Sequence, residues 1–414
     1  MFKVVIIGAG LGGLACAVAC RRYGLEVVVL EQAPRITPIG AGIQAPPNAS
    51  RALKWLGLLE QVQAKACLPD SFDLLRYEDG SCIIRRDIRD SEQRYRAPWI
   101  VIHRADYHKA LLDAAVSAGA EIRLGSIVTN IDFEDTTVEV RGGQVISADV
   151  IVGADGLWST ARDRILGHPS PPRETGDLAY RATLKTSDLL ALDDARVTDL
   201  CKQQHCTVWV GPNKHCVFYP VKGGSEYNLV LIRPDDLPPG TNKVQGEIGE
   251  MRENFKGWDS SLTKIISRIP AGNVTVLGDA CHPTLPYQAQ GAAMAVEDGA
   301  VLGNLIGSLV RDEKELPGPA HEHVGSLLQV YEKLRKLRTT TNAKGAEANQ
   351  YMFHLEDGEE QRRRDTELKA HDWIRPSRWR WADPSAQDEL LGHDVIAESE
   401  MAYKEWKSSK IHKI

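Results

Sequence analysis

Short apolar runs alternate with glycine-rich turns at the start of the chain. Residues 4–7 are all branched and apolar, which is typical of a buried parallel strand. A glycine cluster at residues 8–13 follows directly, and residues 15–22 have the pattern of a helix. A second apolar run over residues 26–30 ends at Glu31. The pattern predicts a strand, a tight turn, a helix and a second strand.

The glycines of this turn have the spacing of a dinucleotide-binding fingerprint. Gly8 permits the tight turn, Gly10 lets the backbone approach a pyrophosphate, and Gly13 lets the helix pack closely on the strand. The N-terminus of the helix offers free N–H groups and partial positive charge to the phosphates. Glu31, about 20 residues further on, stands where an acid binds ribose hydroxyls. The sequence therefore predicts a dinucleotide site.

Two later apolar runs also end in turns with glycine and aspartate. The run over residues 148–152 leads into a turn that contains Asp155, and the run over residues 274–277 leads into Gly278 and Asp279. A loop to Gly291 and a helix over residues 292–309 follow the second turn. Ligands collect at the carboxyl ends of strands in a doubly wound sheet, so we expect these turns to lie beside the first one.

The pattern of apolar and polar residues changes between residues 178 and 233. Short alternating runs over residues 204–210, 215–221 and 227–233 are separated by turns, which predicts a separate antiparallel sheet. Side chains alternate along a strand, so His215 and Tyr219 are expected on the same face. A hairpin is expected at residues 79–80, and the chain beyond residue 312 is expected to be helical and charged.

Composition narrows the function. The chain has 414 residues and a formal net charge of −6, which argues against a general affinity for nucleic acid. Residues 4–20 are nearly free of charge, but their glycines fit the nucleotide fingerprint better than a membrane or signal segment, and we expect no other stretch to be long and apolar enough to span a bilayer. The eight cysteines are scattered, so we expect free thiols and a cytoplasmic protein. The His-Cys pairs at residues 205–206 and 215–216 lack zinc-site spacing, so no metal is expected.

Together, the turns at residues 8–13, 153–156 and 278–279 resemble those of the single-component FAD-dependent aromatic hydroxylases, the group of para-hydroxybenzoate hydroxylase. The resemblance covers about residues 4–338 and is closest to salicylate hydroxylase and the fungal phenol hydroxylases. It implies an α/β fold: a Rossmann-like FAD-binding domain with an inserted antiparallel substrate sheet and a helical C-terminal region. We assign the FAD-binding domain to residues 1–75, 97–177 and 268–345, the substrate domain to 76–96 and 178–267, and the C-terminal region to 346–414.

The resemblance also implies roles for single residues toward a non-covalent FAD. Arg104 would meet the phosphates (a solvated helix start is the alternative), Asp155 belongs to a motif associated with FAD and NAD(P)H, and Asp279 would bind the ribityl chain. The helix after Gly291 would point its N-terminus at the flavin and stabilise its negative charge. The family usually has Gly-Gln-Gly where this chain has Ala289, Gln290 and Gly291. The implied FAD residues are Gly8, Gly10, Gly13, Glu31, Arg35, Ala41, Gly42, Arg104, Asp155, Asp279, Gly291 and Ala292.

Three residues of the inserted sheet match positions at which relatives handle the substrate, and a fourth residue lies by resemblance at the flavin. Arg181 would bind a phenolate or carboxylate, and His215 and Tyr219 would relay a phenol proton. Pro286 would line the pocket in which oxygen meets the reduced flavin. The alternatives are an exposed strand arginine, a satisfied core histidine and a packed tyrosine.

The implied activity is that of a monooxygenase. NAD(P)H would reduce the flavin, O2 would form a flavin C4a-hydroperoxide, and a phenolic or related aromatic substrate would be hydroxylated. An epoxidase or a dearomatising enzyme acting on a polyketide or terpenoid intermediate of secondary metabolism is the alternative. We expect no nucleic-acid or membrane partner. Homodimerisation and the choice between NADH and NADPH stay open.

Overall fold

The N-terminal unit forms as the sequence predicts. In the computed structural model, strand β1 (Lys3–Ile7), helix α1 (Leu11–Arg22) and strand β2 (Glu26–Leu30) follow one another. With β7 (Glu121–Arg123) and β11 (Val150–Gly153) the strands form a parallel sheet in the order β11-β1-β2-β7. We call it the nucleotide-binding sheet. The structure describes residues 1–36, 41–171, 177–235, 248–268 and 286–411.

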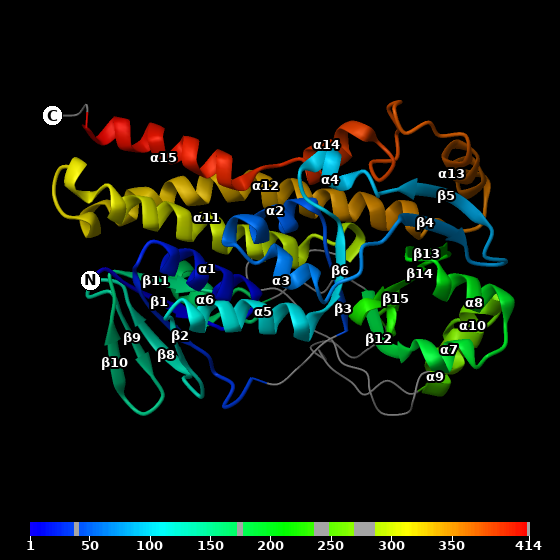
Figure 1. Cartoon of the computed structure of the whole chain (residues 1–414), viewed down its shortest axis with the longest axis horizontal. Helices are drawn as coiled ribbons and strands as arrows, with labels where there is room; N and C mark the ends of the chain where they lie inside the picture. Colours follow the sequence, from blue (N-terminus) through cyan, green and yellow to red (C-terminus); the bar gives the residue numbers. More distant parts are fainter. Residues whose placement is uncertain (37–40, 172–176, 236–247, 269–285, 412–414) are drawn as a thin grey trace.

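Helices α1, α5 (Arg104–Ser117) and α11 (Gly291–Arg311) pack together in the core around this sheet (Figure 1). Glycines let α11 approach α1: a Cβ atom at Gly299 would lie 2.4 Å from the Gly12 oxygen, and one at Gly303 would lie 2.2 Å from the Ala19 Cβ. Contrary to our expectation, α11 is long and apolar enough to cross a membrane, but 83% of its apolar window is buried. It is the central core helix.

A three-stranded antiparallel sheet covers the opposite face of the nucleotide-binding sheet. Its strands are β8 (Val128–Asp132), β9 (Thr137–Val140) and β10 (Gln144–Ser147). Ile131 and Val138 of this sheet share an apolar cluster with Val5 and Val28. The branched residues of β1 and β2 are therefore buried on both faces, as their uninterrupted apolar pattern requires.

The inserted sheet has six strands in the order β12-β15-β14-β13-β4-β5. The predicted hairpin at residues 79–80 joins β4 to β5, and the neighbouring pairs are antiparallel except that β13 runs parallel to β4. The predicted antiparallel sheet is therefore mixed at that junction. The strands are β4 (Ser71–Arg76), β5 (Cys82–Asp87), β12 (Asp177–Lys185), β13 (His205–Gly211), β14 (Lys214–Val221) and β15 (Glu226–Pro234).

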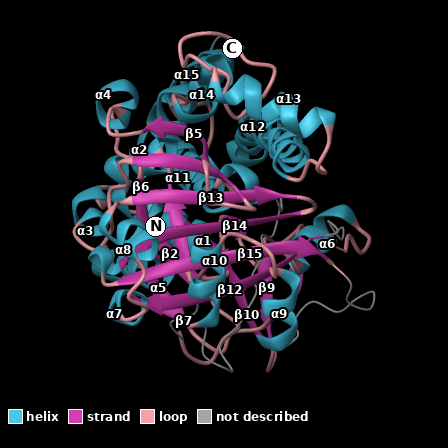
Figure 2. Ribbon diagram, turned by 90° about the vertical axis from the view of Figure 1, so that its right-hand side faces the viewer, coloured by secondary structure: helices cyan, strands magenta, loops and turns pink. Residues whose placement is uncertain are grey.

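The two faces of the inserted sheet have different neighbours. Cys216 and Phe218 share an apolar cluster with Val197 and Met251 from the small helices that cover one face (Figure 2). The other face carries His215 and turns toward the rest of the molecule. The small helices are α7 (Thr186–Leu190), α8 (Ala195–Lys202), α9 (Ile248–Asn254) and α10 (Ser260–Ser267).

The remaining elements connect the two sheets and cover them. The antiparallel pair β3–β6 lies between the sheets, and the C-terminal helices run along one side of the whole molecule (Figure 1). Our domain boundary at residue 345 falls inside the continuous helix α12, and the boundary at residue 75 falls inside β4, which pairs with β13. These elements are β3 (Gly42–Ala45), β6 (Ile100–His103), α2 (Pro47–Leu56), α3 (Leu59–Gln63), α4 (Ser91–Tyr95), α6 (Thr160–Leu166), α12 (Val324–Phe353), α13 (Glu359–Lys369), α14 (Pro384–Leu391) and α15 (Val395–Ile411), with short 3₁₀ turns η1 (Lys222–Gly224), η2 (Pro286–Gln288), η3 (Glu313–Glu315) and η4 (Ala320–His323).

A buried ion network joins α11 to α2 and α12. The Glu297 carboxylate is fully buried and accepts hydrogen bonds from Arg335 (2.8 Å), Arg338 (3.2 Å) and Asn48 (2.7 Å). Burial raises the pKa of Glu297, but the positive charges of Arg335 and Arg338 and the Asn48 hydrogen bond outweigh it and hold that pKa at about 2. Glu297 is therefore ionised in the folded protein and fixes the position of α11.

Candidate active site

The glycines of the turn at residues 8–13, which we call the glycine turn, have two different structural roles. Gly8 has a φ of +106°, and a Cβ atom there would lie 2.3 Å from the Ala154 oxygen. A Cβ atom at Gly13 would lie 2.1 Å from the Gly8 oxygen, so both glycines are required by close packing. Gly10 differs because a Cβ atom there would meet no atom of the described residues within 4 Å. The side of the turn on which Gly10 lies is open.

This open space lies in front of the N-terminus of α1. Gly10 is the N-cap residue and has no side chain to bond the N–H groups of the first helical turn. A pyrophosphate is the natural acceptor for uncapped N–H groups at such a site. The geometry therefore fits the phosphates of FAD.

Glu31 is held beside the same turn. Its Oε2 atom accepts from the Ala9 N–H (2.8 Å) and its Oε1 atom accepts from the Ala33 N–H (2.9 Å). Each carboxylate oxygen can accept a further hydrogen bond, so the predicted contact with ribose hydroxyls fits. Arg35 is exposed a few residues further on.

Helix α5 is tied to the glycine turn and to Ala41. His108 donates from Nε2 to the Ala9 oxygen (2.7 Å), and the Arg104 N–H donates to the Ala41 oxygen (3.0 Å). Arg104 is half-buried at the start of the helix. The structure thus brings Arg104 and Ala41 together, and His108 is a contact that the sequence pattern did not reveal.

Two predicted cofactor residues make protein contacts instead of presenting a free group. The Asp155 carboxylate accepts from the Ser159 hydroxyl (2.5 Å) and from the Ala161 N–H (3.0 Å), so it braces the start of α6. The Gly42 N–H donates to Asn228 (2.7 Å), and a Cβ atom at Gly42 would lie 2.6 Å from the Tyr219 ring. Gly42 is glycine because the inserted sheet packs against it.

The start of α11 is a second uncapped helix terminus. Gly291 and Ala292 begin the helix, and the N-cap residue Gln290 makes no side-chain bond to its first turn. Gln290 is buried, and within the described residues its Nε2 atom has no hydrogen-bond partner. An orphaned buried donor beside a helix N-terminus fits an acceptor-rich ring such as isoalloxazine. Asp279 lies outside the described residues.

The predicted catalytic residues of the inserted sheet share one face, and two of them are buried. Arg181 lies opposite Val230, which lies opposite Val217, between His215 and Tyr219 on β14. His215 is 1% exposed and Tyr219 is 4% exposed. Burial raises the pKa of Tyr219 well above its usual range, and the nearby charge of Arg181 opposes that rise. The Nε atom of Arg181 is buried and has no hydrogen-bond partner among the described residues.

A cavity lies between this face, the η2 loop and the C-terminal region. His215 and Val217 line it, and Arg181 and Tyr219 do not. Its volume is about 50 Å³, room for one or two water molecules, so a bound aromatic ring requires the lining side chains to move apart. Pro286 begins η2 next to this cavity. The other lining residues are Gln44, Phe72, Arg86, Trp99, Val208, Tyr287, Gln288, Ala289, Asn349, Phe353, Trp381, Gln387 and Leu390.

Sequence reasoning missed a chain of polar groups behind His215. The Nδ1 atom of His215 lies 2.9 Å from the Nε2 atom of His354, which is also 3.3 Å from the Tyr287 hydroxyl. Tyr287 donates to Asp177 (2.5 Å), and Gln350 donates to the same Asp177 oxygen (2.6 Å). Only the loop position of Tyr287 could have drawn attention, because the other members lie far apart in the sequence.

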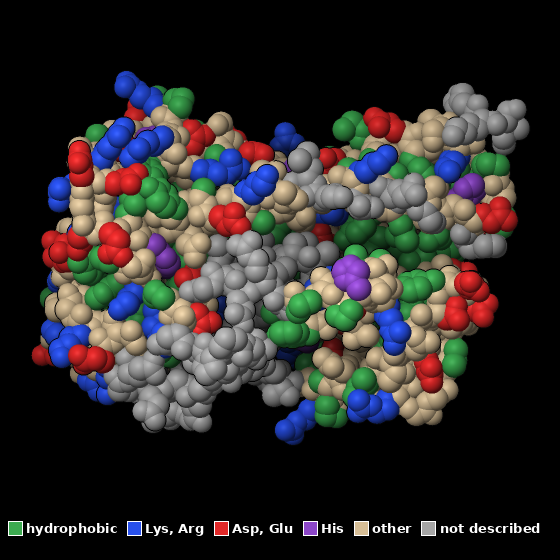
Figure 3. All heavy atoms as spheres, turned by 180° about the vertical axis from the view of Figure 1, so that it is seen from behind, with side chains coloured by type: hydrophobic (Ala, Val, Ile, Leu, Met, Phe, Trp, Pro, Cys, Tyr) green, Lys and Arg blue, Asp and Glu red, His purple; other side chains and the backbone are tan. Residues whose placement is uncertain are grey.

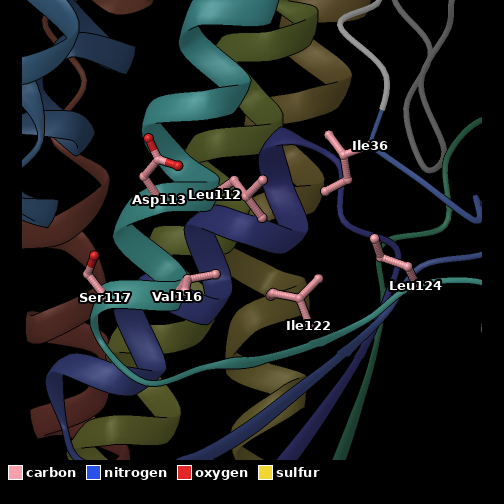
Figure 4. A pocket seen from close by; sticks show the side chains of 7 residues that line it. All are labelled: Ile36, Leu112, Asp113, Val116, Ser117, Ile122 and Leu124. Atoms are coloured by element: carbon pink, nitrogen blue, oxygen red, sulfur yellow. The ribbon is translucent and has the colours of Figure 1, made fainter.

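A second pocket lies on the surface of the nucleotide-binding half and has a volume of about 470 Å³. Leu112 and Val116 of α5 point toward Ile122 and toward the space beside Leu124 and Ile36 (Figure 4). None of the predicted cofactor or catalytic residues lines this pocket. The candidate active site is therefore built around the glycine turn and the inner cavity.

Comparison with known proteins agrees with this geometry. The family model described as FAD binding domain matches residues 1–238. The FAD-dependent monooxygenase OpS4 of Beauveria bassiana (strain ARSEF 2860) is 37% identical over 426 residues, which cover 96% of each chain. A 3-hydroxybenzoate 6-hydroxylase of Polaromonas naphthalenivorans (strain CJ2) is 35% identical over 324 residues, covering 73% of this chain and 78% of that one.

Solved structures share the fold at lower identity. A salicylate hydroxylase substrate complex has a TM-score of 0.75 at 22% identity, covering 97% of this chain and 98% of that one. The structure of CtdE in complex with FAD and a substrate has a TM-score of 0.78 at 20% identity, covering 99% of both chains. The predicted fold class, a Rossmann-like domain with an inserted sheet and a helical C-terminal region, is confirmed.

Proposed function

The chain belongs to the FAD-dependent monooxygenases that carry this FAD-binding domain, and on that premise we propose that it hydroxylates a phenolic small molecule with NAD(P)H and O2. The observation that carries the proposal is that His215, on the inserted sheet, faces the η2 loop across one cavity. Bound FAD supplies the redox chemistry that takes electrons from NAD(P)H and activates O2. The chain's residues hold that cofactor, orient the substrate and keep water out.

The cavity walls favour a flat aromatic substrate. Phe72 lies 6.1 Å from Trp99 and 5.6 Å from Trp381, ring centre to ring centre, so aromatic rings form one wall. Such a wall packs against an aromatic ring and excludes water, which would otherwise divert activated oxygen from the substrate.

The substrate is proposed to carry negative charge. Arg86 lines the cavity, donates to the neutral side chain of Gln387 and lies over the Trp373 ring, 5.6 Å from its centre. Burial lowers the pKa of Arg86, although Tyr95 and the Asp90 carboxylate oppose this shift. A phenolate or an aromatic carboxylate in the cavity would add a negative charge beside its guanidinium.

The proposed function also indicates which kinds of partner the protein binds and where it is located. On the face in Figure 3, lysine and arginine side chains are interspersed with acidic ones, which suits small-molecule chemistry better than nucleic-acid binding. We place the enzyme in the cytoplasm because the cysteines of the described part are free thiols.

Activity with a panel of phenols tests the proposal. We expect purified protein to bind one FAD per chain and to consume NAD(P)H and O2 faster when 3-hydroxybenzoate, salicylate or a related phenol is added. Product mass should increase by one oxygen atom, and NMR should show a new ring hydroxyl. Oxygen transfer to an alkene, or a product ring that is no longer aromatic, would instead favour the alternative hypothesis of an epoxidase or a dearomatising enzyme. An FAD-loaded protein that ignores all phenols would contradict hydroxylation.

Replacing His215 by alanine should uncouple the reaction. The variant removes the one predicted catalytic side chain of the sheet that lines the cavity. We expect FAD binding and NAD(P)H oxidation to persist, while product formation falls about ten- to a hundredfold because a hydrogen bond to a charged group is lost. Hydrogen peroxide should account for the difference, measured with a peroxidase assay.

Tyr219→Phe is the matched comparison. Tyr219 lies on the same face but packs against Gly42 and does not line the cavity, so we expect a smaller effect on coupling. If Tyr219→Phe uncouples the enzyme and His215→Ala does not, the substrate lies beside Tyr219 on that face and the assignment to this cavity is wrong.

A further inference from the structure

We propose that His354 and Asp177 are positioning residues that hold His215 in one tautomer, with its Nε2–H pointing at the substrate as a hydrogen-bond donor to an ionised oxygen. The inference rests on the proposed function and deepens it. It assigns His215 the role of a fixed donor, where the sequence suggested a proton relay. His354 and Asp177 act through His215 and are not placed against the substrate.

The donor and acceptor roles along this chain of groups can be assigned outward from Asp177. Its Oδ2 atom accepts from Gln350 (2.6 Å) and from the Tyr287 hydroxyl (2.5 Å). An ionised carboxylate can only accept, so the single hydroxyl proton of Tyr287 points at Asp177. The oxygen of Tyr287 is then left as an acceptor toward its other neighbour.

That neighbour is the Nε2 atom of His354. It lies 3.3 Å from the Tyr287 oxygen and 2.9 Å from His215 Nδ1. A proton on His354 Nε2 satisfies both contacts, because it can be shared between two acceptors. A bare Nε2 atom would face the lone pairs of Tyr287. The geometry therefore selects the Nε2–H tautomer of His354.

His215 follows from His354. Since Nδ1 of His215 accepts that proton, a neutral His215 carries its own hydrogen on Nε2. Nε2 has no hydrogen-bond partner among the described residues, and His215 lines the cavity. Its N–H is thus available to a substrate oxygen.

Both imidazoles need to be neutral for this arrangement, and their surroundings keep them so. Burial and the neighbouring His354 lower the pKa of His215 well below its ordinary value. Burial lowers the pKa of His354 to about 4, although the negative charge of Asp177 opposes this. Phe353 and Tyr287 pack around His215 with ring centres 5.6 Å and 4.8 Å away, so aromatic rings surround the His215 imidazole.

Nitrogen NMR of the histidine rings tests the tautomer without any substrate. FAD-loaded protein labelled with ¹⁵N-histidine should show His215 and His354 as neutral Nε2–H rings at pH 7, assigned by the loss of signals in His215→Gln and His354→Gln. His323→Gln is the matched control, since His323 is buried but bonds to Pro317 elsewhere, and it should leave the pair unchanged. A charged ring, or an Nδ1–H tautomer of His215, would overturn the proposal whether or not the protein hydroxylates phenols.

Asp177→Ala tests the cause. Alanine removes the carboxylate that accepts the Tyr287 proton, so that proton can turn toward His354 and reverse both histidine tautomers. We expect His215 to become an Nδ1–H ring and the phenolate of 3-hydroxybenzoate, followed by its ultraviolet spectrum, to bind about ten- to a hundredfold more weakly. Tyr287→Phe removes the hydroxyl oxygen that contacts His354, and it should leave His215 in a mixture of tautomers. Unchanged tautomers in both variants would show that the chain behind His215 does not set its orientation.

Discussion

Gly10→Val is expected to abolish FAD binding and to leave the fold intact. Among the described residues, a Cβ atom at this position meets nothing within 4 Å, and the backbone angles of Gly10 (φ −74°, ψ −179°) are open to any residue. The Cβ atom of a valine would therefore disturb no contact in the described part of the chain. It would occupy the space through which a pyrophosphate reaches the N-terminus of α1. Losing two charged hydrogen bonds, each worth about 1.5–3 kcal/mol, weakens binding at least about a hundredfold.

A fluorescence titration with FAD and a thermal melt of the apoprotein measure both halves of this prediction. Gly13→Ala is the contrasting variant, because its Cβ atom would lie 2.1 Å from the Gly8 oxygen. We expect Gly13→Ala to lower the melting temperature of the apoprotein and Gly10→Val to leave it unchanged. FAD binding by Gly10→Val at the parent affinity would mean that the pyrophosphate lies elsewhere.

The cofactor half of the molecule could be predicted because its signals are local. Gly8, Gly10 and Gly13 lie in one turn, and Glu31 ends the next strand, so spacing along the chain carries most of the geometry. The hairpins of the inserted sheet were predictable for the same reason. Even here packing added information: Gly42 and Asp155 match family positions, but their immediate partners are protein groups.

The groups behind His215 could not be predicted because only tertiary packing brings them together. His354 lies 139 residues from His215, and Tyr287 lies 110 residues from Asp177. No period or motif links such positions. They meet because α12 crosses the predicted domain boundary and places its last turn against β14. The roles of Arg181, Tyr219 and Pro286 stay predictions.

Glu297→Gln is expected to destabilise the protein strongly although it changes few atoms. The substitution keeps the size of the side chain but removes the charge that compensates Arg335 and Arg338, which are 5% and 7% exposed. In the variant, Arg335 still has the Asp298 carboxylate as a partner at 2.5 Å. Arg338 still donates to the backbone carbonyl oxygens of α14, which carry no full negative charge. Leaving a buried charge without its partner costs about 3–5 kcal/mol, which urea denaturation at pH 7 measures. Glu347→Gln, on an exposed part of α12, removes the same charge and should cost little.

The pH dependence identifies the carboxylate itself as the cause. The pKa of Glu297 is about 2 in the folded protein and about 4.3 in an unfolded chain, so the unfolded state binds the proton first as pH falls. The stabilisation is therefore complete above about pH 5 and is lost between about pH 4.3 and pH 2, at about 1.4 kcal/mol per pH unit. Glu297→Gln lacks this titration, so the difference in unfolding free energy between parent and variant should be constant from pH 8 to pH 5 and shrink below it. A difference that stays constant down to pH 3 would mean that the variant acts through packing and that the Glu297 charge does not hold α11 in place.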